Sequence, residues 1–372
     1  MRTRRDRTRR NRCEELMSAT LIIVVIIALV FDFTNGFHDT ANSIATMVGT
    51  RALSPQLAVA MAAILNFVGA FLSLEVAATI GKDIINPEIV TLDVVLAGLT
   101  GAIVWNLATW LFGIPSSSSH ALVGGLVGAA ITHAGVSGVL WSGLTHKVLI
   151  PSVVAPTLGL IVAGLSMAVL MRLFRNSNPH QANKIFRWLQ IPSGAWLSLT
   201  HGMNDAQKTM GIISLALLLE HGDTSAAFDV PLWVVFSAAS AMALGTYAGG
   251  WKIIKTLGGK VVKMSPVQGF AASSSAAAIL YWSGHSGFPV STTHCVSGTV
   301  MGAGASKRLS SVRWNVAGDI FTAWVLTLPC AALVGVIAYA LTAISPVVLL
   351  IVAGGLIVRM RIQMQRSGAP AH

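Results

Sequence analysis

Long apolar runs separated by short polar segments make up most of this chain. Stretches able to cross about 30 Å of hydrocarbon occur at roughly 18–37, 55–80, 90–112, 147–171, 191–219, 231–250, 318–342 and 345–359. Their length suits membrane-spanning helices, whereas a membrane β-barrel would show short segments of alternating apolar and polar residues. The pattern therefore predicts an all-α polytopic membrane protein.

Two further apolar pieces are interrupted. Residues 114–133 and 267–306 contain Pro, Gly and clustered hydroxyl side chains. Irregular backbone is tolerated at membrane depth only where it is buried in protein or lines a wet cavity. We therefore expect two re-entrant hairpins at these positions.

Three sequence patterns occur twice, in the same order. The pairs are GFHDTAN at 36–42 and GMNDAQK at 202–208, TIGK at 79–82 and TLGGK at 256–260, and PSSSSH at 115–120 and PVSTTH at 289–294. Asp39 thus corresponds to Asp205. The repeated order predicts two homologous halves, and interrupted segments at matching places in two halves are typical of a transporter with its site near the bilayer midplane.

The most polar internal segment lies between these halves. The predicted division is a disordered basic tail at 1–16, a first repeat at 17–171, a central linker at 172–190, a second repeat at 191–360 and a tail at 361–372. If the repeats are inverted, the first crosses the membrane an odd number of times and the linker faces the side opposite both termini. Both tails and the linker are basic, so the distribution of positive charge does not give the orientation.

Composition supports a membrane location. The chain is 54% hydrophobic and 10% charged, with a mean hydropathy of +0.70, which a soluble domain of this length could not bury. Much of the net charge of +11 comes from arginines among residues 2–12, a segment expected to be disordered and interpreted as an upstream extension before Met17. A signal peptide is the alternative, but no small-residue cleavage site follows. We expect contact with membrane lipid and none with nucleic acid.

An ionisable group directly after an apolar run is a candidate functional residue. The first copy supplies Asn35, His38, Asp39 and Asn42, and the second supplies Asn204, Asp205, Gln207 and Lys208. Gly36 and Gly202 would give the backbone freedom for a helix break beside each acid. An interfacial loop is the alternative, which the second copy makes less attractive.

Hydroxyl side chains cluster at both predicted hairpin tips. They are Ser117, Ser118 and Ser119 in the first, and Ser291, Thr292 and Thr293 in the second. A Ser or Thr that opens a helix caps it, and the free N–H groups there attract anions. Two ordinary N-caps are the alternative; two matched copies in broken membrane segments favour one shared anion site.

The duplicated GFHDTAN and PSSSSH motifs resemble the signatures of the inorganic phosphate transporter (PiT) family, over nearly all of Met17 to Arg359. The resemblance implies an inverted repeat of broken transmembrane helices with two re-entrant hairpins, about ten to twelve membrane helices in all. It also implies a homodimer in the bacterial inner membrane, termini outside and the central loop cytoplasmic. Phosphate would lie between the broken helices and the hairpin tips.

Phosphate beside Asp39 and Asp205 would be repelled unless a cation intervenes. The expected substrate-binding residues are Asp39, Asn42, Ser117, Ser118, Ser119, Asn204, Asp205, Ser291, Thr292 and Thr293. The expected coupling-cation residues are Asn35, His38, Asp39, Asp205, Gln207 and Lys208, with Lys208 either a fixed positive charge for the substrate or a structural partner of Asp205. No cofactor and no metal ligand is assigned.

The coupling ion is H⁺ or Na⁺. Many family members have Asn where this chain has His38; the sequence resembles bacterial members with FHD, which favours H⁺ and the carriage of metal–phosphate complexes. Three other functions compete: a sulfate permease of the same architecture, a passive channel, and an intramembrane hydrolase that uses Ser with His120 or His294. The duplication argues against a hydrolase, so we expect a symporter and not an enzyme.

Overall fold

The computed structural model describes residues 4–222, 228–347, 349, 351–355 and 358–359. Its α-helices are α1 (Arg4–Gly49), α2 (Pro55–Gly69), α3 (Glu75–Lys82), α4 (Leu92–Phe112), α5 (Ser118–Ala134), α6 (Trp141–Gly143), α7 (Ile150–Leu173), α8 (Pro179–His221), α9 (Leu232–Ala248), α10 (Trp251–Lys255), α11 (Pro266–His285), α12 (Thr292–Ala305) and α13 (Trp314–Thr342). Short 3₁₀ or π turns lie at Gly135–Gly138, Leu144–Leu149, Thr256–Lys260 and Leu309–Ser311. Helices thus dominate the described part of the chain, and the predicted all-α class is confirmed.

Several of these helices are long and apolar enough to cross a membrane. Among the described residues five helices qualify, or six if α9 and the segment 251–260, bent by 60°, count as one broken span. The apolar face of α13 is largely exposed, as expected of a helix that contacts lipid or a partner. The membrane character predicted from the sequence is therefore confirmed, while the larger expected number of membrane helices stays a prediction.

The order of elements recurs between the two halves. The series α1, α2, α3, α4, α5, α7 is followed by α8, α9, α10, α11, α12, α13. The halves exchange neighbours, since α5 packs on α13 and α12 on α7, while α2 packs on α8 and α9 on α1. Isolated β-bridges join Ile85 to Val139 and Val262 to Val312 at matching places. Most of the predicted linker 172–190 is helical, because α8 already begins at Pro179.

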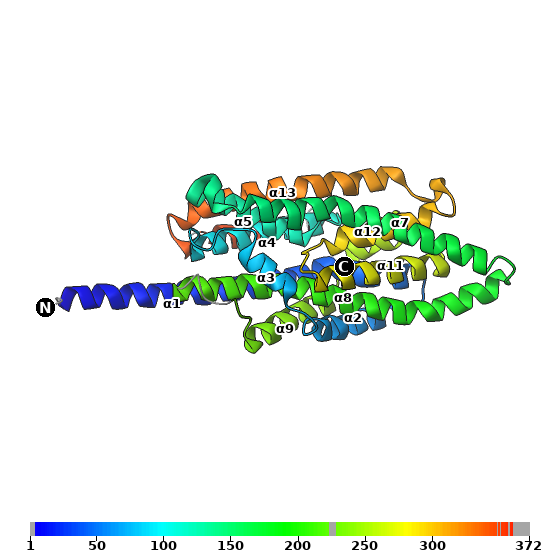
Figure 1. Ribbon diagram of the computed structural model, residues 1–372, viewed down its shortest axis with the longest axis horizontal. Coiled ribbons are helices and arrows are strands. Elements are labelled where there is room, and N and C mark those ends of the chain that lie inside the picture. The colour runs from blue at the N-terminus through cyan, green and yellow to red at the C-terminus, as the bar shows by residue number, and fades with distance from the viewer. Residues whose placement is uncertain (1–3, 223–227, 348, 350, 356–357, 360–372) are drawn as a thin grey trace.

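Helices α1 and α8 run side by side in opposite directions near the middle of the molecule (Figure 1). The Thr50 hydroxyl, just after α1, donates to Oε1 of Gln190 near the start of α8, at 2.6 Å. Asp32, earlier in α1, lies beside Thr209, late in α8. Polar faces of both helices therefore meet along their length.

The helix breaks expected at Gly36 and Gly202 are absent, because α1 and α8 run through both positions without interruption. A Cβ on Gly36 would lie 2.4 Å from the carbonyl oxygen of Met242, and one on Gly202 would lie 2.2 Å from that of Asn66. These glycines admit a neighbouring backbone at distances that no side chain would permit. Their role is close helix packing, not backbone freedom.

The N-terminal end of α1 projects beyond the rest of the molecule (Figure 1). The helix begins at Arg4, so helical backbone extends into the segment 1–16 for which the sequence predicts disorder. Arg is a good helix former, and this part continues an existing helix without a new nucleus. The C-terminal tail expected at 361–372 lies outside the described residues.

Candidate functional site

Four segments meet between the two halves: the centres of α1 and α8, and the turns that connect α4 to α5 and α11 to α12. Each turn contains a Pro, at Pro115 and Pro289, and is followed by the first residues of α5 or α12. Extended backbone at Ser117 and Ser291 aims these helix starts at α1 and α8. The hairpin tips and the acidic helix centres are thus neighbours, as predicted.

Asp39 accepts hydrogen bonds from both hairpin tips. The Ser118 hydroxyl donates to its Oδ2 at 2.8 Å, and the Thr292 hydroxyl approaches the same oxygen at 3.5 Å. Nδ1 of His38 lies 2.6 Å from its Oδ1. The carboxylate therefore links the two halves through hydroxyl groups.

Asp205 has the matching position in the second half, but its partners include a charge. The Thr292 hydroxyl donates to its Oδ2 at 3.3 Å. The ammonium of Lys208 donates to its Oδ1 and also to the hydroxyl of Ser119. Lys208 is fully buried, and a buried ammonium needs such a counter-charge. Of the two roles considered for Lys208, the structure places it as the partner of Asp205.

The polar contacts follow an approximate twofold relation. Nδ2 of Asn42 donates to the hydroxyl of Thr293 at 2.9 Å. Lys208, at the matching position of α8, donates to Ser119, which matches Thr293. Each acidic helix thus contacts the hairpin tip of the other half.

The whole cluster is closed to solvent in this conformation. The side chains of Asp39, Asp205, Lys208, Ser118, Ser119, Thr292 and Thr293 are each at most 3% exposed. Hydroxyl and ammonium donors satisfy the carboxylates in place of water. Any ion that binds here must enter and leave through a change of conformation.

Ser117 and Ser291 have a different role from the other hydroxyl residues. Each is the N-cap of its helix, and its side-chain oxygen accepts from the backbone N–H of His120 or His294 at 3.2 Å. These two members of the predicted substrate set therefore shape the tips through N-cap hydrogen bonds. The N–H groups of the two residues that follow each cap, Ser118 and Ser119 in α5 and Thr292 and Thr293 in α12, have no acceptor within their own helix, so they remain available to an anion.

His38 and Asn204 attach the helix centres to the hairpins. Nε2 of His38 lies 3.2 Å from the hydroxyl of Thr109, at the end of α4. Nδ2 of Asn204 donates to the carbonyl of Leu280 in α11 at 2.8 Å, and Ser283 donates to its Oδ1 at 3.3 Å. Asn204, expected to bind substrate, thus has partners in α11 rather than at the tips.

Two predicted coupling residues contact other elements. Oε1 of Gln207 accepts from the backbone N–H groups of Val76 and Ala77, at 2.9 and 3.2 Å, so Gln207 caps α3. Nδ2 of Asn35 lies 3.9 Å from the sulfur of Met242, and its Oδ1 is buried without a partner. Asn35 therefore keeps a free acceptor, whereas Gln207 does not lie free beside the acids.

Two buried residues of this region are not among those predicted. His201 lies one turn before Asp205, and its Nε2 is 3.5 Å from Oδ2 of that acid. Asp32 lies two turns before Asp39, and neither of its carboxyl oxygens has a hydrogen-bond partner among the residues that the structure describes. Extending the repeat alignment beyond the motif would have paired His201 with Asn35. The position of Asp32 on the same helical face as Asp39 would have identified it.

One group of side chains could hold a cation. Single ligand atoms of Asp39, His201 and Asp205 lie within 4.8 Å of one another, and all three residues are buried. Sequence spacing does not predict this group, because it combines residues from α1 and α8. The grouping is the direct result of the antiparallel contact between these helices.

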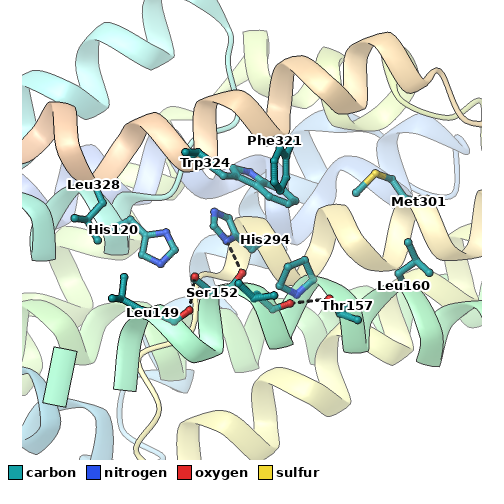
Figure 2. Close-up of a pocket in the computed structure, with 13 residues that line it drawn as sticks. His120, Leu149, Ser152, Thr157, Leu160, His294, Met301, Phe321, Trp324 and Leu328 are labelled. Atoms are coloured by element: carbon teal, nitrogen blue, oxygen red, sulfur yellow. Dashed lines mark hydrogen bonds between the residues drawn. The ribbon is translucent and has the colours of Figure 1, made fainter. Parts of the chain in front are cut away.

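His120 and His294 line a cavity of about 420 Å³ between α7 and α13, and none of the hydroxyl residues of the two tips belongs to its lining (Figure 2). Their rings lie 4.7 Å apart, and that of His294 stacks on Trp324 at 4.1 Å. Their rings do not support the Ser and Thr side chains of the tips, because the contacts with the caps come from their backbone N–H groups. Among the described residues neither ring has a hydrogen bond to a serine hydroxyl, since Nδ1 of His294 faces the carbonyl oxygen of Ser152 at 3.4 Å, so neither histidine is placed as the base of the Ser–His hydrolase considered above.

Several known proteins are similar to this chain. Residues 35–335 match the model of the phosphate transporter family. The chain is 52% identical over 321 residues to a probable low-affinity inorganic phosphate transporter of Mycobacterium tuberculosis, covering 86% of this chain and 77% of that one. A Bacillus subtilis protein of the same description is 47% identical over 329 residues, covering 87% and 98%. A solved structure described as the sodium-dependent phosphate transporter shares the fold, with a TM-score of 0.81 at 24% identity over 88% of this chain and 99% of that one.

Proposed function

Because this chain belongs to the phosphate transporter family, we propose that it is a secondary active transporter that carries inorganic phosphate with a coupling cation across the bacterial cell membrane. The observation that carries the proposal is the closed cluster in which two hairpin tips meet Asp39 and Asp205. A site with many hydroxyl donors, two helix N-termini and two acceptors suits an oxyanion that also carries protons.

Phosphate would replace the contacts that the cluster now makes with itself. The hydroxyls of Ser118, Ser119, Thr292 and Thr293 would turn from the carboxylates and Lys208 toward its oxygens, and Asn42 would add its amide. Asp39 and Asp205 would accept the protons of the phosphate. Ser117 and Ser291 would act by fixing the tips.

Sulfate is the competing substrate. It has the same shape, but near neutral pH it has no proton to donate to Asp39 or Asp205, so these carboxylates would face it as unpaired like charges. The presence of two buried acceptors therefore favours phosphate. Competition between the two anions for uptake into liposomes discriminates: excess sulfate should leave phosphate uptake unchanged.

Coupling to a cation follows from charge. The two acids face one ammonium, that of Lys208. A bound phosphate with one or two negative charges therefore leaves the site with an excess of negative charge, which a buried site does not tolerate. Protons or sodium ions would remove it. A divalent cation that travels with phosphate would find the group formed by Asp39, His201 and Asp205. We favour H⁺ as the coupling ion.

Inverted repeats at 17–171 and 191–360 would provide alternating access. The antiparallel contact of α1 with α8 and the exchange of neighbours between the halves support this arrangement. Opening one end of the pair α1–α8 while the other stays closed would expose the site to one side at a time. By resemblance to the family, the protein would be a homodimer with its termini outside.

Radiolabelled phosphate uptake into proteoliposomes tests the proposal. An imposed proton gradient should drive phosphate above its external concentration, and a sodium gradient alone should not. Equilibration without accumulation under either gradient would indicate a passive channel instead. Absence of any phosphate flux in a folded preparation would contradict phosphate transport itself.

A further inference from the structure

Asp32 is a fully buried acid that the proposed phosphate site does not use. Its side chain is 0% exposed, and neither carboxyl oxygen has a hydrogen-bond partner within the described part of the chain. Asn35 and Thr209 lie beside it, and Oδ1 of Asn35 and Oγ1 of Thr209 also lack a hydrogen-bond partner among the described residues. Three neighbouring buried side chains thus each have a polar atom that no other described residue pairs.

An ionised carboxylate is not stable in such a place. Removing a charge from water without hydrogen bonds or a counter-ion costs far more than the folded state can supply, so the group takes up a proton instead. As a neutral acid Asp32 could donate to Oδ1 of Asn35 or the hydroxyl of Thr209. Burial without hydrogen-bond partners therefore favours the neutral, protonated form of Asp32 in the closed conformation.

The charged groups that act most strongly on Asp32 belong to α8. Lys208 and Asp205 face it from α8, where His201 lies one turn further, and His38 and Asp39 follow on α1 itself. Of the other helices packed on α1, α9 and α2 carry no acidic or basic residue and α4 carries only Asp93, in its first turn. Helix α10 carries Lys252 and Lys255, while α5, α11 and α12 contribute only histidines as titratable basic groups. Lys208 is thus the cation able to stabilise an ionised Asp32.

The two repeats differ at the positions of Asp32 and Lys208. The spacing that pairs Asp39 with Asp205 pairs Asp32 with Ser198 and Lys208 with Asn42. Because α1 and α8 are antiparallel, the acid Asp32 and the ammonium of Lys208 lie at the same end of the helix pair. The opposite end has the neutral Ser198 and Asn42. One end alone therefore combines this unpaired acid with a lysine.

We propose that Asp32 carries the coupling proton, an inference that rests on the proposed phosphate transport. One proton from the loading side binds the Asp32 carboxylate, and Lys208 then stays with Asp205 and Ser119 beside the phosphate. After reorientation the same proton leaves to the opposite side. The ionised Asp32 then attracts Lys208 away from Asp205, which weakens the phosphate site and favours release. One proton enters and one leaves per cycle, and no other bond is made or broken.

Substitution of Asp32 separates coupling from substrate movement. Asp32→Asn keeps the size of the side chain but cannot exchange a proton, so phosphate accumulation driven by a proton gradient should be lost. Counterflow, the exchange of labelled for unlabelled phosphate without a gradient, should persist. Asp32→Glu keeps a carboxyl group that can exchange a proton, so this variant should still accumulate phosphate. The matched control is Asp319→Asn, an exposed acid on α13, which should behave like the unmodified protein.

The outcomes are distinct. Proton-driven accumulation of phosphate by Asp32→Asn at the normal proton-to-phosphate ratio would overturn the proposal. Phosphate accumulation by the unmodified protein that only a sodium gradient drives would overturn it as well. Loss of counterflow in the wild type would contradict phosphate transport itself. If Asp32→Asn does not fold, the unmodified protein still provides a test: a hydrophobic carbodiimide, which reacts with protonated carboxyl groups, should label Asp32, as mapped by mass spectrometry. Labelling at Asp39 or Asp205 and not at Asp32 would overturn the assignment.

Discussion

Asp39 and Asp205 occupy matching positions but differ in what stabilises them. Hydroxyl donors and His38 surround Asp39, whereas Asp205 has the ammonium of Lys208 as a direct partner. A buried charge pair and a buried hydrogen-bonded acid respond differently to substitution. The two acids can therefore be distinguished by experiment, although the motifs that contain them are similar.

Removing either acceptor should abolish transport. Asp39→Asn and Asp205→Asn replace a proton acceptor for phosphate by an amide, and we expect concentrative phosphate uptake into proteoliposomes to be lost in both. Phosphate binding by isothermal calorimetry should weaken in parallel. Asp319→Asn serves as the control. Unchanged uptake by either site variant would remove that carboxylate from the mechanism.

Breaking the pair of Lys208 with Asp205 should also reduce stability. Lys208→Met leaves a buried carboxylate without its ammonium, a change that typically costs about 3–5 kcal/mol. The melting temperature in detergent should fall clearly. The double variant Asp205→Asn with Lys208→Met removes both charges and should recover much of the stability without recovering transport. Additive losses in the double variant would show that the two side chains do not interact.

At the scale of single elements, the hairpin helices depend on their first residue. Ser117 and Ser291 each accept a backbone N–H three positions later, and the helices α5 and α12 begin directly after them. The cap fixes the position of the following hydroxyls. Its loss would therefore act on the site indirectly.

Replacement of a cap should affect stability in a graded way. Ser291→Ala removes the acceptor and should cost about 1 kcal/mol, whereas Ser291→Gly typically costs only a few tenths. Thermal unfolding should rank the alanine variant below the glycine variant and both below the wild type. Thr293→Ala, which leaves the cap intact, should instead lower phosphate affinity with little change in melting temperature. Equal melting temperatures for Ser291→Ala and the wild type would contradict the capping role.

Close packing of α8 on α2 depends on Gly202. A Cβ at this position would lie 2.2 Å from a backbone oxygen that cannot move independently, so Gly202→Ala should destabilise the protein by about 1–3 kcal/mol or prevent its folding. The matched control is Gly318→Ala on α13, where nothing lies within 4 Å of the added carbon. Similar expression and melting temperature for both variants would show that the contact at Gly202 can relax.

At the scale of the whole molecule, the antiparallel pair of α1 and α8 relates the two halves. Its two ends lie far apart along the long axis of the molecule (Figure 1). The end that includes Thr50 and Gln190 is also where the turn between α7 and α8 lies, since α8 begins at Pro179. Opposite directions for matching helices are what an inverted repeat requires.

Membrane topology can be tested by labelling single cysteines. In a variant without the native cysteines, Ser54→Cys after α1 and Lys184→Cys early in α8 should react with a membrane-impermeant maleimide from the same side. His221→Cys at the end of α8 should react from the other side. All three positions are exposed. Reaction of Ser54→Cys and His221→Cys from the same side would exclude the inverted arrangement.

The sequence alone determined the class of this protein and most of its central residues. Apolar runs fix an all-helical membrane protein, because backbone groups in lipid must be satisfied within each helix. The duplicated motifs identified Asp39, Asp205, Lys208 and the hydroxyl tips, because chemistry that is repeated in order leaves a local signature.

Only the tertiary structure decided which of these side chains meet. From the sequence, Gly36 and Gly202 are predicted to break their helices, yet both allow a neighbouring helix to pack closely. Gln207 is predicted to belong to the site, yet it caps α3. The roles considered for Asp32 and His201 follow from the contact between α1 and α8, which only the folded chain contains. Local sequence specifies the side chains that a helix offers, but the partner of a buried group is set by packing between residues more than a hundred positions apart.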